Sequence, residues 1–361
     1  MRIVRPLAIA VSLAMAWIAL TARVQGADSI RLVDVSPSDV SAMQQAPGCS
    51  DGRCFFPCTM CPCDYIVMEG LMMQRDNAAA NNPLVLTTGT QVPSTVFSTG
   101  DLNFDLASGF RIYGGHRFNE CWAIEAGYFG LWGPTATASV IEPNQLLIPG
   151  DLGLAVNNFG FADRVDLEYT SQIQGAEANA VLCTTCGDCC DRYCQSIEWI
   201  GGVRYLSLTE RFSLTSYDSL ESVSTYGVHT QNNLYGGQAG ARIRRCYGRF
   251  SLEGTGKAGA YYNDANQAQD SITDFPSLLI RDHRSASDEK IAFVGEVSLT
   301  GIYQLNCVWG LRAGYNLMWV EGVALAPDQL DFTNTQTSGT AINLDGSLFV
   351  HGLSAGLEAR W

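Results

Sequence analysis

Apolar and polar residues alternate over long stretches of this 361-residue chain. In one stretch Leu102, Phe104, Leu106, Phe110 and Ile112 occupy one set of alternate positions, and Asn103, Asp105, Arg111 and Tyr113 occupy the other. In a later stretch Val165, Leu167, Tyr169 and Ile173 alternate with Asp166, Glu168, Thr170 and Gln172. Because successive side chains of a β-strand point to opposite faces, this period of two predicts strands with one apolar and one polar face.

The alternating stretches are much longer than the ~5–6 residues typical of globular strands. We count ten, with twelve as the alternative: residues 63–74, 102–118, 121–132, 164–182, 195–214, 229–245, 247–262, 289–304, 307–320 and 346–361. Short turns near Asn119, Arg245 and Asn306 and at 183–194 alternate with long connections at 75–101, 133–163, 215–228, 263–288 and 321–345. Long strands with alternating short and long connections are typical of bacterial outer-membrane proteins. The pattern therefore predicts an all-β fold, a transmembrane up-and-down antiparallel β-barrel of about ten strands.

Two pairs of tryptophans support a lipid-facing surface. Trp122 and Trp132 lie on one apolar face, and Trp309 and Trp319 are spaced in the same way. Their spacing spans roughly 25 Å along a tilted strand, which is the height of the lipid-facing band. We therefore expect each pair to place one ring in each aromatic girdle. Trp361 ends an alternating stretch and is interpreted as a signal for the barrel assembly machinery.

The first residues have the pattern of a secretory signal peptide. Arg2 and Arg5 precede an apolar run that starts at Leu7, and small residues precede a cleavage site ahead of Ala27. The run is shorter than the ~20 residues that span a bilayer comfortably as a helix. We expect three parts: residues 1–26 as signal peptide, 27–62 as a cysteine-rich periplasmic lead segment, and 63–361 as the barrel in the cell outer membrane.

The chain is acidic, with 22 Lys and Arg residues against 36 Asp and Glu residues and a net charge of −14. This balance argues against nucleic acid as a partner, because its recognition needs a basic patch. It also favours attraction of cations over anions. No second apolar stretch reaches ~20 residues, so no further membrane helix is expected.

Strand parity predicts which charged side chains face the barrel interior. The set is Asp105, Arg111, Glu125, Asp166, Glu168, Glu198, Arg204, Arg242, Glu253, Lys257, Glu296, Arg312, Glu358 and Arg360. The mixed signs favour ion pairs that fill the interior. Ten strands lie closer to the roughly eight of barrels filled by side chains than to the roughly 16 to 18 of open porins. We favour a plugged lumen, with a narrow cation-preferring pore as the alternative.

Thirteen cysteines occur, and all lie near predicted short turns or in the lead segment. They are Cys49, Cys54, Cys58, Cys61, Cys63, Cys121, Cys183, Cys186, Cys189, Cys190, Cys194, Cys246 and Cys307. We therefore expect all of them on the periplasmic side. Disulfides are the favoured state in an exported chain, although two runs also have spacings that metal sites use. The odd number leaves at least one for a metal, a free thiol or a bond to a periplasmic or cell-wall protein.

Four segments resemble a known family. They are NNLYGGQAGARI (232–243), GKAGAYYN (256–263), FVGEVSLTGIYQL (293–305) and RAGYNLMWVEGVALAPDQLD (312–331). They resemble the beta-barrel porin families of planctomycete-type bacteria, including beta-barrel porin 7, over roughly residues 63–361. The resemblance implies an exported outer-membrane barrel embedded in outer-membrane lipid, and it supplies no catalytic residues.

The leading functional hypothesis is a structural or passive envelope barrel that is not an enzyme and needs no cofactor or metal. A surface-binding, adhesin-like role through the long loops is the second hypothesis. A loop-borne hydrolase is the third, with His283 beside Asp282 as its best candidate base. Carboxylates at Asp264, Asp270 and Asp274 lack the spacing of a known Ca²⁺ loop and are interpreted as part of a solvated loop.

Overall fold

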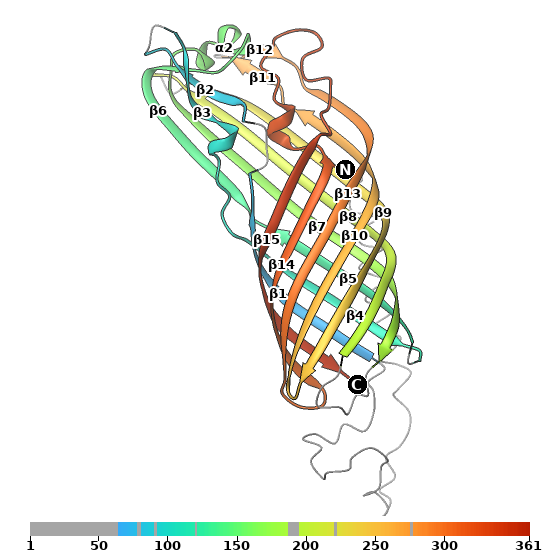
Figure 1. Cartoon of the computed structure of the whole chain (residues 1–361). Coiled ribbons are helices and arrows are strands. Elements are labelled where there is room, and N and C mark those ends of the chain that lie inside the picture. The colour runs from blue at the N-terminus through green and yellow to red at the C-terminus, as the bar shows by residue number, and fades with distance from the viewer. Residues whose placement is uncertain are drawn as a thin grey trace, which may run out of the picture.

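The computed structural model describes residues 64–77, 81–89, 92–119, 121–186, 195–219, 222–274 and 277–361. Within them, ten antiparallel strands close into a ring in the order β1, β4, β5, β7, β8, β9, β10, β13, β14, β15 and back to β1 (Figure 1). The ten-stranded antiparallel barrel predicted from the sequence is confirmed. The predicted signal peptide (1–26) and lead segment (27–62) lie outside the described residues.

The strands of the ring are β1 (Asp64–Arg75), β4 (Ala107–Arg117), β5 (Trp122–Trp132), β7 (Ala162–Cys186), β8 (Gln195–Tyr217), β9 (Val223–Tyr247), β10 (Phe250–Gln269), β13 (Arg284–Gln304), β14 (Trp309–Val323) and β15 (Gly346–Arg360). Outside the ring lie β2 (Pro83–Thr87), β3 (Ser94–Ser98), β6 (Thr135–Leu147), β11 (Ile272–Asp274), β12 (Leu278–Arg281), α2 (Leu152–Ala155), η2 (Thr99–Asp101), η3 (Asn157–Phe159) and η4 (Ala326–Gln329). No helix among the described residues is long and apolar enough to cross a membrane.

The ring closes where β1 meets β15. Eleven residue pairs join the two strands, from Tyr65 opposite Arg360 to Arg75 opposite Val350. Two further backbone hydrogen bonds of 2.9 Å connect Asp64 and Trp361 in both directions. Closure follows from the physics of lipid, which cannot satisfy the unpaired N–H and C=O groups of an open sheet edge.

Short turns gather at one end of the ring, which we call the turn end. The side-chain oxygen of Asn119 accepts a hydrogen bond from the N–H of Trp122 (2.9 Å), and Asn306 accepts one from Trp309 (2.8 Å). Asparagine stabilises a tight turn by mimicking a backbone acceptor in this way. The predicted turn near Arg245 lies instead at Gly248, whose φ of 64° suits glycine, because β9 continues to its end at Tyr247.

The opposite end, which we call the loop end, is built from strands that continue far beyond β1, β4 and β5 (Figure 1). Strands β7 and β9 have 25 residues each, and β6 and β2 extend the sheet beside β7. Much of the chain that we predicted as long connections is therefore strand. The predicted strands were too short because the same alternation places apolar side chains outward in one part of these strands and inward in the other.

Strand β8 shows the change. Near the turn end its outward side chains are apolar, as at Trp199 and Val203, and its inward Arg204 is charged and buried. Near the loop end the outward side chains are polar, as at exposed Arg211, and the inward Phe212 is fully buried. A barrel turns its apolar side chains outward in lipid and inward in water. The wall therefore has one section suited to each medium.

Two apolar cores fill the ring above the charged section. The middle core includes Leu71, Leu131, Ile173, Leu206, Leu234, Val294, Met318 and Val350. The loop-end core includes Leu84, Leu102, Phe104, Ile148, Phe159, Val165, Leu167, Tyr169, Phe212, Leu214 and Tyr226. We predicted Leu102 and Phe104 on the apolar face of a strand. They lie instead in the loop-end core, because β4 begins only at Ala107.

The β14–β15 loop, residues 324–345, enters the loop end and packs against the inside of the wall. The side chain of Asn232 donates to the carbonyl of Ala324 (2.9 Å), and Gln269 donates to the carbonyl of Gln329 (2.8 Å). Arg281 donates to the carbonyl of Asp331 (2.8 Å). These side chains come from β9, β10 and β12, so the loop is fixed to three separate elements.

The loop also stabilises itself around Asp331. Burial raises the pKa of this carboxyl, but hydrogen bonds from Thr333 and from the backbone N–H of Gly339 outweigh burial and lower the pKa below its usual value. The ionised carboxylate is therefore the form that stabilises the turn.

Candidate functional site: the barrel interior

The outer surface carries the tryptophans that the sequence singled out. Trp122, Trp309 and Trp319 are exposed by 43–49%, and Trp132 is half-buried against Phe110, with ring centroids 5.4 Å apart. Trp361 is exposed at the turn end. All five lie on the outer, apolar surface of the barrel wall, on the side away from the charged interior.

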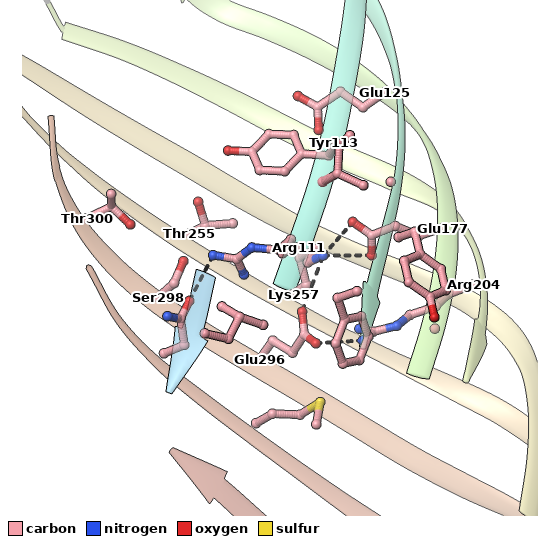
Figure 2. A pocket seen from close by; sticks show the side chains of 18 of the residues that line it. Arg111, Tyr113, Glu125, Glu177, Arg204, Thr255, Lys257, Glu296, Ser298 and Thr300 are labelled. Carbon is pink, nitrogen blue, oxygen red and sulfur yellow. Dashed lines mark hydrogen bonds and ion pairs between the residues drawn. The ribbon is translucent and has the colours of Figure 1, made fainter. Parts of the chain in front are cut away.

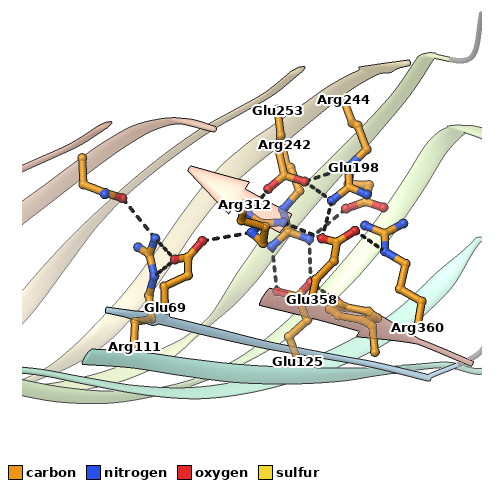
Figure 3. Close-up of polar contacts among 12 residues, drawn as sticks. Glu69, Arg111, Glu125, Glu198, Arg242, Arg244, Glu253, Arg312, Glu358 and Arg360 are labelled. Atoms are coloured by element: carbon orange, nitrogen blue, oxygen red, sulfur yellow. Dashed lines mark hydrogen bonds and ion pairs between the residues drawn. The ribbon is translucent and has the colours of Figure 1, made fainter. Parts of the chain in front are cut away.

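Arg312 on β14 is the centre of the interior. Its guanidinium donates to carboxylates from three other strands: Glu69 on β1 (2.9 Å), Glu253 on β10 (2.8 Å) and Glu358 on β15 (2.6 Å) (Figure 3). Its side chain is only 3% exposed. Arg244 on β9 joins the same group through Glu253 (2.9 Å). One arginine thus connects β14 to its neighbour β15 and to the next strand but one on either side, β1 and β10.

A second group surrounds Arg242 on β9. Its guanidinium forms a two-pronged contact with Glu125 on β5, at 2.6 and 2.9 Å, and a further bond to Glu198 on β8 (3.0 Å). Tyr65 on β1 also donates to Glu125. Two-pronged arginine–carboxylate pairs are among the stronger and geometrically most specific contacts in proteins. This group therefore holds β5, β8 and β9 together across the lumen.

A third group lies around Lys257 on β10 (Figure 2). Its ammonium contacts Glu177 on β7 at 2.7 and 2.8 Å and Glu296 on β13 at 3.3 Å. Arg204 on β8 donates to the other oxygen of Glu296 (2.7 Å). Gln238 also donates to Glu177, at 2.9 Å.

The interior brings together eleven of the fourteen predicted charges, and three are corrected. The eleven are Arg111, Glu125, Glu198, Arg204, Arg242, Glu253, Lys257, Glu296, Arg312, Glu358 and Arg360. Asp105 precedes β4 and is exposed. Asp166 and Glu168 face outward on the loop-end section of β7, because the alternate residues Val165 and Leu167 are buried in the apolar core.

The sequence reading missed four charges of the interior: Glu69, Arg117, Glu177 and Arg244. Two of them could have been found, because Arg117 shares the strand parity of Arg111 and Arg244 shares that of Arg242. Glu177 was missed because the alternate residues of β7 that face inward are those that we had predicted to face outward. Glu69 lies in a strand with methionine and leucine on both faces, where no alternation is visible.

The ion pairs described for the charged section involve eight cations and seven carboxylates. The cations are Arg111, Arg117, Arg204, Arg242, Arg244, Lys257, Arg312 and Arg360, and the carboxylates are Glu69, Glu125, Glu177, Glu198, Glu253, Glu296 and Glu358. The interior is thus nearly neutral and does not share the acidity of the whole chain. A buried charge without its partner would cost several kcal/mol, so the near balance of signs is a condition of folding.

A cavity of about 100 Å³ lies within this charged section (Figure 2). Its lining combines charged residues of the three groups with the hydroxyls of Tyr113, Thr255, Ser298 and Thr300 and the amide of Asn316. The space suffices for a few water molecules.

The loop end has its own buried pair. Arg75 on β1 contacts Glu210 on β8 at 2.7 Å, and both side chains are at most 1% exposed. Glu210 also accepts the N–H of Ala326 in η4 at 2.9 Å. The carboxylate therefore connects the wall to the β14–β15 loop.

The cysteines of the described residues lie at the turn end. Cys121 is exposed with a free thiol, and its carbonyl accepts the N–H of Cys183 on the neighbouring strand (2.8 Å). Cys246 is the last but one residue of β9, and Cys307 lies in the turn before β14. Cys49, Cys54, Cys58, Cys61, Cys63, Cys189, Cys190, Cys194 and the side chain of Cys186 lie outside the described part.

No cluster of three or more metal-binding side chains occurs among the described residues. Asp264 and Asp270, interpreted as loop residues, are in fact on or directly after the long strand β10. His283 is exposed between β12 and β13, where the neighbouring carboxylate of Asp282 accepts its backbone N–H at 2.7 Å.

A family model described as "Putative beta barrel porin-7 (BBP7)" matches residues 69–361. No curated protein matches the sequence. Among solved structures, the outer membrane protease OmpT from Escherichia coli has a TM-score of 0.45 at 8% identity, with 82% of this chain and 96% of that chain covered. Ail of Yersinia pestis has a TM-score of 0.23 at 8% identity, covering 81% and 97%. The outer membrane protein OprG of Pseudomonas aeruginosa has a TM-score of 0.23 at 8% identity, covering 83% and 97%.

Proposed function

The chain belongs to the beta barrel porin-7 family, and from this premise we propose that it is an outer-membrane barrel with a closed lumen and a structural or passive role. The observation that carries the proposal is the set of ion pairs between strands that are not neighbours in the ring: Arg242 with Glu125, Lys257 with Glu177 and Arg204 with Glu296. A lumen that conducts ions needs a continuous aqueous path, and these contacts across the lumen oppose one.

Two further features support closure. The middle and loop-end cores fill the bore with apolar side chains above the ion pairs. The β14–β15 loop adds backbone inside the loop end, fixed by Asn232 and Gln269. The alternative of a narrow cation-preferring pore is less well supported, because the ion pairs described for the charged section combine eight cations with seven carboxylates. The acidity of the chain therefore does not extend to its lumen.

Recording across a planar lipid bilayer tests the proposal. The purified barrel should insert without steady conductance steps in concentrated KCl, and an open porin in the same bilayer is the positive control. Insertion is verified by gel electrophoresis of vesicles prepared in parallel. A folded barrel migrates differently in the gel when the sample has not been boiled first. Reproducible steps of one amplitude would show that the lumen conducts and would end the closed-lumen proposal.

Topology and export belong to the same proposal. We place the turn end in the periplasm, the loop end outside the cell, and the predicted signal peptide (1–26) at the start of export. In this orientation the cysteines meet the oxidising periplasm, where disulfides or a bond to a cell-wall protein can form. Proteases added to whole cells should cut near 333–337 and spare 305–308. Mass spectrometry of unreduced peptides would then identify the cysteine pairs.

A surface-binding role is the second candidate. The observation in its favour is the loop end itself, where strands β7 to β10 present an exposed wall of polar side chains such as Thr209, Arg211 and Asp264. Labelled barrel in lipid nanodiscs should bind a cell surface, and removal of the loop end by protease should abolish that binding. Equal binding after proteolysis would exclude this role.

A further inference from the structure

The interior cavity has one wall of uncharged polar side chains. Thr255, Ser298 and Asn316 are direct cross-strand partners on β10, β13 and β14, so they form a row inside the ring. Arg111 from β4 reaches the end of this row, where its Nη2 donates to the Oδ1 of Asn316 at 3.1 Å (Figure 2). The row and the guanidinium therefore face the same cavity.

The row contains a buried donor without an acceptor. Asn316 is 7% exposed, and its Nδ2 has no hydrogen-bond partner among the described residues. The orientation of the amide is fixed, because a guanidinium can only donate and therefore needs the Oδ1 on its side. The amide thus presents its N–H₂ as a donor that nothing in the wall satisfies. A buried donor of this kind calls for an acceptor in the cavity.

The charges around the cavity also point to an acceptor with negative charge. The ion pairs described for the charged section contain one cation more than carboxylates, and Arg111 is one of the cations that have no carboxylate to themselves. Its carboxylate, Glu69, is shared with Arg312. The side chain of Arg111 is 28% exposed, whereas that of Arg312 is 3% exposed. Since Arg111 lines the cavity, this open part of the guanidinium is available to a ligand there.

We propose that the cavity binds one small monovalent inorganic anion of halide size, held by the Arg111 guanidinium, the Nδ2 of Asn316 and the hydroxyls of Ser298 and Thr255. Each of these groups can donate to an anion, and hydroxyls rotate to do so. One bound anion balances the extra cation. The volume of about 100 Å³ admits a halide with some water and excludes large organic anions.

Bromide is the probe. Crystals of the full-length barrel soaked in NaBr should show one anomalous peak in the cavity, within hydrogen-bond distance of Asn316 Nδ2. Thermal unfolding in detergent should rise with NaBr relative to sodium gluconate at equal ionic strength. Asn316→Leu and Thr255→Val should each weaken this halide dependence, with the apparent affinity of Asn316→Leu at least tenfold lower.

Thr230→Val is the matched control, because Thr230 is a buried, inward threonine of β9 that does not line the cavity. It should keep the full halide dependence. Absence of a bromide peak, or equal halide dependence in the control and both cavity variants, would overturn the proposal. Thr255→Val and Ser298→Ala remove only hydroxyls and keep the test valid if Asn316→Leu does not fold. Bilayer conductance is measured separately, so a leaking barrel that binds bromide would refute only the closed lumen.

Discussion

Replacement of Arg312 by methionine gives the sharpest test of the interior. The substitution keeps an unbranched side chain and removes three charge-assisted hydrogen bonds to Glu69, Glu253 and Glu358. Each carboxylate keeps another arginine: Glu69 keeps Arg111, whereas Glu253 and Glu358 keep contacts with Arg244. The loss is therefore smaller than that of three orphaned charges. We expect the substitution to lower the free energy of unfolding by about 3–5 kcal/mol, the range for a broken buried ion pair.

The assay is urea unfolding of the barrel refolded into lipid vesicles, followed by tryptophan fluorescence and by migration in a gel without boiling. Arg211→Met is the matched control, since Arg211 is exposed on the outer face of β8. It should change the unfolding free energy by no more than about 0.5 kcal/mol. A second variant, Glu253→Gln, should show coupling with Arg312→Met in a double-mutant cycle, because the two side chains are 2.8 Å apart.

Unfolding of Arg312→Met at the urea concentration of the wild type would refute the stabilising role of Arg312. That result would mean that the three contacts do not exceed the cost of removing a guanidinium from water. Additive effects of Arg312→Met and Glu253→Gln would likewise exclude the direct pair, even if each variant alone were unstable.

Three other expectations follow. Gly356→Ala should cost about 1–3 kcal/mol in the same urea assay, because its Cβ would lie 2.0 Å from a carbonyl oxygen of β1, whereas Gly254→Ala, with nothing within 4 Å, should be neutral. Glu210→Gln should cost about 3–5 kcal/mol and speed proteolysis of the β14–β15 loop, because it leaves a buried arginine unpaired. Since the pKa of Asp331 is lowered in the folded protein, its contribution to stability is complete above the unfolded pKa of about 4 and is lost as pH falls through the lower folded pKa. Loop proteolysis should therefore accelerate in acid, and Asp331→Asn should remove that dependence.

Much of the fold could be predicted from alternation because lipid imposes a strict rule on the outer face of a barrel. Strand β13 follows it over its lipid-facing length, with Ile291, Phe293 and Val297 outward and Glu296 inward. The rule holds only where lipid is the solvent. In β7 the apolar residues of the same alternation face inward. Asp166 was therefore assigned to the wrong face, and the length of the loop-end strands was underestimated.

The interior itself was only partly predictable. Parity identifies which side of the wall a charge faces, and that sufficed for Arg242 and Glu253. It does not identify partners, because the ring brings together residues as distant in sequence as Arg312 and Glu69. The cavity was invisible for the same reason. Its uncharged row depends on the register of β10, β13 and β14, which no spacing along a single strand reveals.

The inversion of polarity along the wall also sets how deeply the barrel sits. Tyr205, Tyr235 and Tyr262 are direct neighbours on three adjacent strands and mark the upper edge of the apolar surface. Asp264 follows only two residues beyond Tyr262 and is exposed. Sinking the barrel by one pleat would carry this carboxylate toward the hydrocarbon, and raising it would lift the tyrosines into water. The molecule therefore has a fixed vertical position in its bilayer, and a thinner or thicker membrane would have to adapt to the protein.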